Sequence, residues 1–269
     1  MTKSRKADVE LSIRQICEAW RLMCRDAPGR RVSRTAGVDY IFSGLPVAFF
    51  NLVVLTQPSI SAAALRTFGE EARAWTVDTT DPWSFVVTNE ALEPGVDAAA
   101  ILGECGLGPA FPLAGMVATA VAPLAAAPAG LRLTVPADDL GCASVVDINS
   151  AAYEMDFGPA KAMLGRQPFW NDQFPVLGTV DGTPASSTAV LALDGCRYVA
   201  LVATRPAYRR RGYAEAVMRQ ALENAATAMG PLPSVLHATE AGRPIYERMG
   251  YTTIASHTLF MDAMLLAGH

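Results

Sequence analysis

A group of cationic and small residues lies between an apolar segment and a helical pattern. The apolar segment, residues 196–204 (CRYVALVAT), predicts a buried strand, which Pro206 ends. The group follows as Arg209, Arg210, Arg211 and Gly212. A helix N-terminus has unpaired N–H groups and a partial positive charge, and arginine adds forked donors for oxyanions. This order of residue types favours a site for a pyrophosphate.

The helix behind this group has a regular apolar face. Its members recur at helical spacing and are Ala214, Val217, Met218, Ala221, Leu222 and Ala225. Gly212 permits a backbone conformation and a close approach that a Cβ atom would block. The alternative is a solvated basic helix start, which the pattern R-x-x-G-x-A alone would favour. Neither a Rossmann nor a Walker A site is predicted, because no G-x-G-x-x-G follows a strand and no G-K-[ST] occurs.

A second signal follows along the chain. Residues 234–238 (SVLHA) predict a short strand, and residues 239–242 cap the next helix. That helix covers residues 243–249 and ends at Gly250, a C′ glycine. Tyr246 lies in its middle, four residues before the glycine. On its own, this tyrosine indicates ordinary core packing.

The elements that must position these residues form an antiparallel meander. Residues 174–180 and 183–192 predict two strands, with the hairpin signal Asp181-Gly182 between them. Asp194-Gly195 gives a second such turn before the strand at residues 196–204. The flanking predictions are helices at residues 144–153 and 158–165 and a last strand pair at residues 251–254 and 258–261.

The first half of the chain has an α/β pattern of its own. Helices are predicted at residues 8–26, 61–75 and 97–107, and strands at residues 38–42, 47–55 and 83–88. Residues 113–136 are rich in Ala, Pro and Gly, with strands at 115–119 and 131–135 as one interpretation. We expect a domain boundary near residue 130, which gives an α/β domain at 1–130 and a second domain at 131–269.

Composition excludes several classes of protein. Lys and Arg number 22 against 26 Asp and Glu, so the net charge is 22 − 26 = −4, and a cationic surface for nucleic acid or anionic lipid is not expected. Five scattered cysteines without C-x-x-C, together with three histidines, argue against a disulfide framework or a metal cage and favour the cytoplasm. The longest apolar run, residues 113–127, is shorter than the ~20 residues that span a bilayer. We therefore expect no metal, no nucleic acid and no membrane partner.

Residues from about 145 to 262 resemble a GNAT acyltransferase domain (Gcn5-related N-acetyltransferase). ATRPAYRRRGYAEAVMRQAL matches the family's V-x-P-x-x-[RQ]-x-x-G-x-[GA] motif at Pro206, Arg209, Gly212 and Ala214. HATEAGRPIYERMGY matches its A-x-x-x-Y-x-x-x-G-F element at Tyr246 and Gly250, with Gly242 where alanine is commoner and Tyr251 for phenylalanine. The resemblance implies an α+β fold in the C-terminal half, in which helices flank a mixed, mostly antiparallel sheet, beside a smaller α/β N-terminal domain.

The resemblance also implies roles for single residues. Val202, Ala203 and Thr204 would pair with the pantetheine arm and acetyl group of acetyl-CoA. The residues that would hold its pyrophosphate are Arg209, Arg210, Arg211, Gly212, Tyr213 and Ala214. Thr239 stands where many members have an asparagine that contacts CoA, and Tyr246 would protonate the departing thiolate.

The chain departs from the family at the catalytic base. Many members place a glutamate on the central strand to take the amine proton, and CRYVALVAT has none. The alternatives are a water chain or one of the side chains Tyr198, Glu154, Asp156 and Asp172. A substrate amine that is already neutral needs no strong base.

The N-terminal half contains neither motif. Its order of helix, strand, helix and strand weakly resembles the reduced partner half of some tandem GNAT proteins, through Phe49, Phe50, Asn51 and Trp83. Such a half would pack on the active domain and wall its cleft. The alternative is an unrelated α+β extension.

Two functions fit these observations. The first is an acetyl-CoA-dependent N-acetyltransferase that acts on a primary amine of a small molecule or peptide. The second is a non-catalytic acyl-CoA-binding module that works as a sensor or scaffold. Transfer of a longer acyl group is a third alternative. The acceptor and the oligomeric state stay open, with a homodimer as one alternative.

Overall fold

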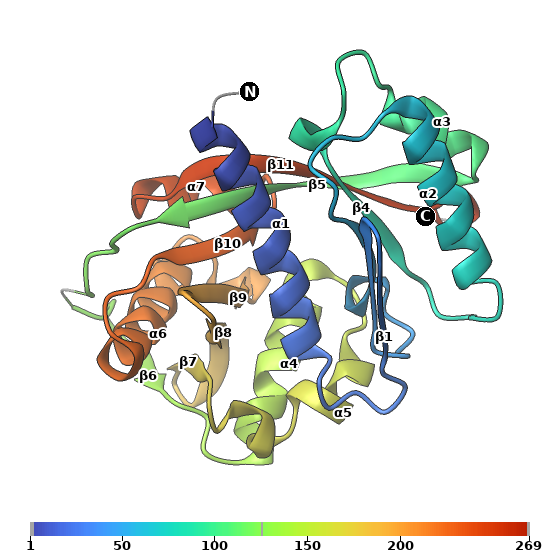
Figure 1. The fold of residues 1–269 in the computed structure, drawn as a ribbon. Helices are drawn as coiled ribbons and strands as arrows, with labels where there is room; N and C mark the ends of the chain where they lie inside the picture. Colours follow the sequence, from blue (N-terminus) through green and yellow to red (C-terminus); the bar gives the residue numbers. More distant parts are fainter. Residues whose placement is uncertain (1–2, 125, 268–269) are drawn as a thin grey trace. The chain divides into compact units, whose positions relative to one another are not determined.

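The chain divides into two compact units in the computed structural model, which describes residues 3–124 and 126–267 (Figure 1). Unit 1 contains residues 1–116, 237–243 and 253–269, and unit 2 contains residues 117–236 and 244–252. These bounds differ from the predicted domains 1–130 and 131–269, because two late segments of the chain return to unit 1. Compactness does not define a family domain, so the boundary near residue 130 stays a prediction.

The strands of unit 2 contain the predicted meander. Their order is β10-β9-β8-β7-β6, with bounds β6 Arg132–Thr134, β7 Phe174–Val180, β8 Thr183–Leu193, β9 Cys196–Thr204 and β10 Ser234–Ala238. All these pairs are antiparallel except β9 with β10, which is parallel. Asp181 and Gly182 both have positive φ, 49° and 79°, as the tight turn between β7 and β8 requires.

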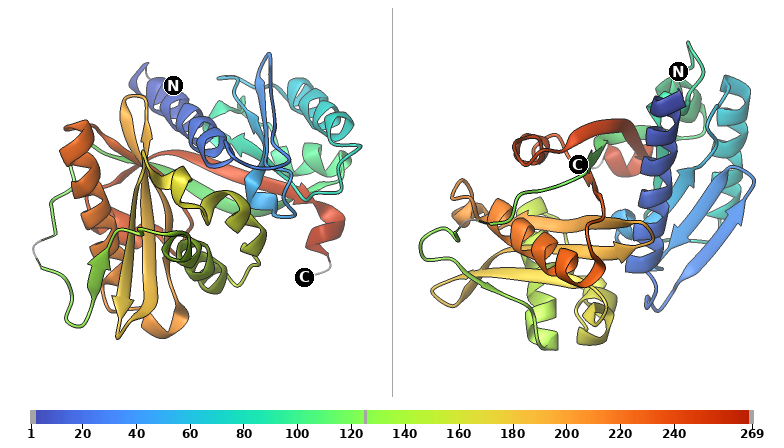
Figure 2. Two further views of the ribbon diagram at one scale, coloured as in Figure 1. Left: turned by 90° about the horizontal axis from the view of Figure 1, so that it is seen from below. Right: turned by 60° about the vertical axis from the view of Figure 1, so that its left-hand side comes forward.

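Two helices cover opposite faces of this meander (Figure 2). They are α4 (Asp139–Tyr153) and α6 (Tyr213–Met229). On β7, Leu177 packs with Val145 and Ile148 of α4, whereas a Cβ on the next residue, Gly178, would lie 3.0 Å from Val217 of α6. Neighbouring residues of a strand point to opposite faces, which fixes the two layers. The shorter helices are η3 Gly158–Ala160, α5 Lys161–Leu164, η4 Gln167–Trp170, η5 Pro206–Tyr208 and α7 Arg243–Arg248.

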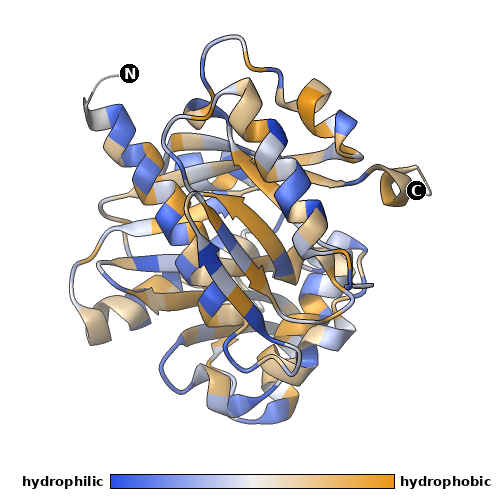
Figure 3. Cartoon of the chain, turned by 45° about the vertical axis from the view of Figure 1, so that its right-hand side comes forward, coloured by the Kyte–Doolittle hydropathy of each residue, from blue (hydrophilic) through white to orange (hydrophobic). Residues whose placement is uncertain are grey.

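Unit 1 has the sheet order β1-β2-β3-β4-β11-β5. The bounds are β1 Arg31–Thr35, β2 Val38–Phe42, β3 Asn51–Leu55, β4 Ser84–Thr88, β5 Leu107–Ala118 and β11 Thr252–Asp262. β3 and β4 are parallel, and every residue of both is buried. The helices are α1 Lys3–Met23, α2 Ala62–Trp75, α3 Ala98–Glu104 and α8 Ala263–Leu266, with short turns η1 Ala48–Phe50 and η2 Asn89–Ala91. The mixed hydropathy of α1 is visible in Figure 3, and its apolar residues Ile13, Ile16, Cys17, Trp20 and Met23 are buried, as is Cys24 directly after it.

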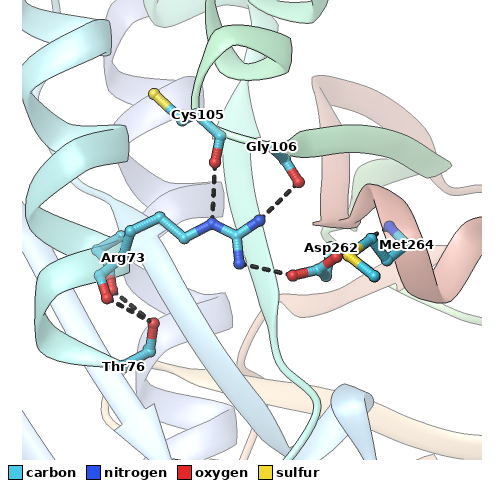
Figure 4. A network of polar contacts seen from close by, with 7 residues as sticks. Arg73, Thr76, Cys105, Gly106, Asp262 and Met264 are labelled. Carbon is cyan, nitrogen blue, oxygen red and sulfur yellow. Dashed lines mark hydrogen bonds and ion pairs between the residues drawn. The ribbon is translucent and has the colours of Figure 1, made fainter. Parts of the chain in front are cut away.

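The C-terminal segment differs from the sequence prediction. The expected strand pair at 251–254 and 258–261 is one strand, β11, whose Phe260 and His257 lie opposite Phe85 and Thr88 of β4. Burial alternates along it through the polar positions, so the polar residues do not break the strand. Arg73 of α2 fixes its end, because the guanidinium contacts Asp262 at 2.6 Å and donates to the carbonyls of Cys105 and Gly106 (Figure 4).

Two further predictions need correction. The expected strand at 47–55 begins as η1, and extended backbone starts only at Asn51. The expected strand at 115–119 is the C-terminal part of the longer β5, while the expected strand at 131–135 is confirmed as β6. The predicted α+β class with a mixed sheet flanked by helices is confirmed. Among the described residues, no helix has the length and apolar character needed to cross a bilayer.

Candidate active site

β9 contains a bulge near its C-terminal end. Ser187 of β8 lies opposite Ala203, and Ala189 lies opposite Ala200, so Leu201 and Val202 together face the single residue Thr188. Leu201 has φ 55°, in the left-handed region. One extra residue in a strand changes which edge the following peptide groups face.

The bulge turns peptide N–H groups toward the edge of β9 that faces away from β8. The N–H of Arg197 donates to Pro233 beside β10, whereas the N–H of Arg205 donates to Ala185 on the β8 side. Eight residues apart, these two groups would share an edge in a regular strand. The N–H groups of Val202 and Thr204 therefore point away from β8, because they alternate with those of Ala203 and Arg205.

Among the described residues of unit 2, no strand pairs with the second half of this edge of β9, which we call its open edge. Within unit 2, β9 pairs with β10 at Arg197 and Tyr198, near its start. The hydroxyl of Tyr153, from the last turn of α4, donates to the Val202 carbonyl at 3.3 Å. The N–H groups of Val202 and Thr204 lie on this edge, and their contact with the arm of CoA stays a prediction. Ala203 is buried, and its carbonyl accepts from Ser186 on the β8 side.

The loop after β9 leads into an uncapped helix. Arg210 and Gly212 have φ 65° and 76°, and α6 begins at Tyr213 without a side-chain cap. A Cβ on Gly212 would meet only Pro128, at an ordinary 3.8 Å, so positive φ is what requires glycine here. Turns that alternate between right- and left-handed backbone conformations can form an anion-binding concavity. Tyr213 itself is buried in the core, and Ala214 is half-buried, so their N–H groups rather than their side chains face the loop.

The three arginines of the loop are exposed and differ in their contacts. Arg209 donates to the carbonyl of Ala152 at the end of α4 at 2.6 Å, and to Thr204 at 3.3 Å. Arg211 donates to Ala207 at 3.4 Å. Arg210 has no hydrogen bond or ion pair with any residue that the structure describes. Arg209 therefore joins the loop to α4, and the role of each arginine toward a ligand stays a prediction.

Tyr246 lies on α7 with 8% of its surface exposed. Burial raises the pKa of this phenol well above its ordinary value, and the neighbouring Tyr153 and Tyr251 raise it further. Its ring centroid lies 6.1 Å from that of Tyr251, whose hydroxyl is hydrogen bonded to Ser234 at 2.5 Å. Within the described ranges, the Tyr246 hydroxyl has no hydrogen-bond partner. A phenol that stays protonated near neutral pH is suited to donate a proton.

Thr239 lies in unit 1, in the turn before α7. Its hydroxyl accepts from the Gly242 N–H at 3.3 Å, and its carbonyl accepts from Arg243 at 3.0 Å. These contacts fix the start of α7. A contact with CoA stays a prediction for this residue.

The candidate bases differ in their surroundings. Tyr198 is fully buried, and burial raises its pKa well above the ordinary value, so its phenolate is disfavoured. Asp156 is exposed and accepts from the Gly158 N–H at 2.8 Å. Glu154 ends α4 with φ 55°, and Asp172 is exposed in the turn before β7. Glu154 follows Tyr153 in sequence, and which of these groups takes the amine proton stays open.

Sequence reasoning missed the contribution of α4. Asn149 and Tyr153 both reach the carbonyls of the β9 bulge. They lie four residues apart and so share one face of the helix. The available signal was the polar Asn149 beside the apolar residues Val145, Val146 and Ile148 in the predicted helix 144–153. No cluster of three or more His, Cys, Asp or Glu side chains that would hold a metal occurs in residues 3–124 and 126–267.

Comparison with known proteins shows which family and which solved structures the chain is similar to. Residues 192–254 match the family model described as the acetyltransferase (GNAT) domain. A GCN5-related N-acetyltransferase from Kribbella flavida has a similar structure, with TM-score 0.69, 23% identity and coverage of 93% of this chain and 95% of that chain. One from Sphaerobacter thermophilus gives TM-score 0.60, 14% identity and coverage of 95% and 92%. No protein of curated function matches the sequence.

A two-domain relative is also similar in structure. The tandem GNAT protein from the clavulanic acid biosynthesis pathway gives TM-score 0.52 at 14% identity, over 87% of this chain and 83% of that chain. The resemblance to the GNAT family is therefore confirmed for the matched segment 192–254, and the solved structures show a similar fold over most of the chain. Acyl transfer is the general chemistry that this family supports.

Proposed function

We propose that this protein transfers an acetyl group from acetyl-CoA to a primary amine of a small molecule or peptide. The observation that carries the proposal is the open edge of β9, where the bulge presents the Val202 and Thr204 N–H groups. The loop in which Arg210 and Gly212 have positive φ, and the helix start without a side-chain cap, follow along the chain. One element thus offers donors for the arm of CoA, and the next offers donors for its pyrophosphate.

The residues divide the chemistry among themselves. The amine nitrogen attacks the thioester carbon, and the N–H groups at the bulge stabilise the negative charge that develops on the carbonyl oxygen. The C–S bond then breaks, and Tyr246 gives its proton to the departing thiolate. The proton lost by the amine goes to water or to an exposed carboxylate such as Glu154. Longer acyl groups would use the same donors.

A specific observation favours the second candidate, an acyl-CoA-binding module without catalysis. The segment CRYVALVAT holds no carboxylate, and its Tyr198 is buried and protonated. Such a module would keep the loop and the open edge of β9 and would need no base.

The test separates binding from transfer. A thermal-shift titration with acetyl-CoA, longer acyl-CoAs and CoA comes first, since a ligand at a hundredfold excess over its Kd stabilises the folded state by ~2.7 kcal/mol. The acyl-CoA that gives the largest shift is then mixed with a panel of small amines and peptides, and free thiol is measured. Amine-dependent thiol release supports the transferase, with acetyl-CoA expected as the best donor. A shift without release supports the binding module, and no shift with any CoA species contradicts both.

A further inference from the structure

The side chain of Asn149 lies at the β9 bulge. Asn149 is a buried residue of α4, and its Nδ2 lies 2.8 Å from the Val145 carbonyl of its own helix. The same nitrogen lies 3.3 Å from the Leu201 carbonyl and 3.3 Å from the Ser187 hydroxyl. The Ser187 hydroxyl donates to the Leu201 carbonyl as well, at 3.3 Å. The bulge carbonyl is thus held from the helix and from the neighbouring strand.

Leu201 needs such support because of its conformation. Its φ of 55° is left-handed, where glycine is the usual residue of a bulge. A residue with a side chain keeps this conformation only when its surroundings fix it. The two donors to the Leu201 carbonyl, Asn149 and Ser187, are buried and provide that restraint.

The last turn of α4 makes two more contacts with the same region. Tyr153, one turn after Asn149, donates to the Val202 carbonyl. Arg209 of the loop donates to Ala152, the residue before Tyr153. Consecutive carbonyls of the bulge, and the loop beyond it, are therefore all tied to one helix turn.

We propose that Asn149 is a positioning residue that acts through the bulge. By holding the Leu201 carbonyl, it fixes the direction of the Val202 N–H, which faces the thioester carbonyl of the acyl donor. This inference rests on the proposed function. A purely structural role for Asn149 would change stability and leave the hydrogen bond to the thioester unaltered.

The first test measures that hydrogen bond without turnover. Infrared difference spectra of acetyl-CoA with a ¹³C-labelled carbonyl are recorded free, bound to the wild type and bound to Asn149→Leu. A hydrogen bond from an N–H lowers the carbonyl stretching frequency, so we expect a lowered band in the wild type that returns toward the free value in the variant. Ser144→Ala is the matched control, because it removes a polar contact, to the Leu140 carbonyl, at the other end of α4.

The outcomes are distinct. If acetyl-CoA does not bind the wild type, the proposed function fails and the inference falls with it. If the wild type binds and its band is unshifted, or is shifted equally in Asn149→Leu, the inference alone is overturned. If Asn149→Leu does not fold, the same infrared measurement is made on Ser187→Ala and Tyr153→Phe. Each of these variants removes one hydroxyl that donates to a carbonyl of the bulge.

A double-mutant cycle tests the route of action. In Leu201→Gly, the glycine adopts positive φ without needing hydrogen bonds to hold it there. With an amine acceptor in hand, we expect Asn149→Leu to lower kcat by about tenfold or more in the wild type, with the Kd of CoA changed less than about twofold. In the Leu201→Gly background, Asn149→Leu should lower kcat by a much smaller factor. An equal loss of kcat in both backgrounds contradicts action through the bulge.

Discussion

Under the proposed function, Gly212 and Tyr246 would serve the site in opposite ways. Gly212 contributes through its backbone, because few residue types other than glycine adopt its φ of 76°. The space around it is open, so no neighbouring atom would exclude a side chain. Tyr246 contributes through a phenol whose proton burial retains. The first is a matter of backbone shape and bears on binding. The second is a matter of protonation and bears on turnover.

We expect Gly212→Glu to weaken CoA binding by more than about tenfold, because it sets a carboxylate beside the pyrophosphate. Calorimetric titration with CoA measures the effect. Gly182→Glu is the matched control, since Gly182 also has positive φ, 79°, and open space, in the turn between β7 and β8. Equal CoA affinity in both variants would remove the loop from the site.

We expect Tyr246→Phe to lower kcat by about 10²-fold, because the thiolate loses its proton donor. The Kd of acetyl-CoA should stay within about twofold, since the ring is kept. Because its pKa lies above the ordinary phenol value of 10, the wild-type rate should show no loss from this group between pH 7 and pH 9. Steady-state kinetics over that range measure kcat and its pH dependence, and calorimetric titration measures the Kd. An unchanged kcat in the variant would exclude Tyr246 from the mechanism.

At the scale of elements, the two halves of the chain have the same order of strands and helices but differ in which backbone donors are paired. The element order of the first half, β2-β3-α2-β4-α3-β5, matches that of the second, β8-β9-α6-β10-α7-β11. That the first half is a reduced GNAT-like half stays a prediction. β3 stays paired with β4 from Leu52 to Val54, and Ile60 in the next loop bridges to Leu92. The Ser61 hydroxyl caps the N-terminus of α2. The donors that are open at β9 and α6 are therefore used internally in unit 1.

We accordingly expect one acyl-CoA per chain. Calorimetric titration of the wild type with acetyl-CoA should give a stoichiometry near one. Gly212→Glu should weaken all of this binding by more than about tenfold and leave no equivalent of wild-type affinity. A second equivalent that survives in Gly212→Glu would show that the first half has a site of its own.

At the scale of the whole molecule, residues far apart in sequence meet in the interior of unit 1. The Ser12 hydroxyl lies 2.8 Å from His257 Nε2 and 3.0 Å from His237 Nε2, and Thr88 contacts His257 Nδ1 at 3.0 Å. A Cβ on Gly115 would lie 2.0 Å from the Ser12 hydroxyl, so glycine lets α1 approach β5. Burial lowers the pKa of His257 to about 4, and lowers that of His237 as well.

This cluster predicts a loss of stability in acid. A histidine whose folded pKa lies below its unfolded value of 6.5 binds its proton mainly in the unfolded state. Its stabilising effect is complete above pH 6.5 and is lost as the pH falls toward 4, by at most about 1.4 kcal/mol per pH unit for each group. Chemical denaturation between pH 7 and pH 4.5 measures the slope, which should be shallower in His257→Asn. An identical slope in that variant would contradict the assignment.

The sequence by itself determined the arginine loop, the helix behind it, the meander and the place of Tyr246 on a short helix, because each depends on local spacing and turn residues. It also predicted the open strand at Val202 to Thr204, through its resemblance to a family. Only the tertiary structure decided that Asn149 and Tyr153 hold the bulge, since that contact joins residues about fifty positions apart. Only the fold, likewise, placed β11 beside β4 in unit 1. Strand partners depend on pairing energies spread over many distant residues, which local patterns do not encode.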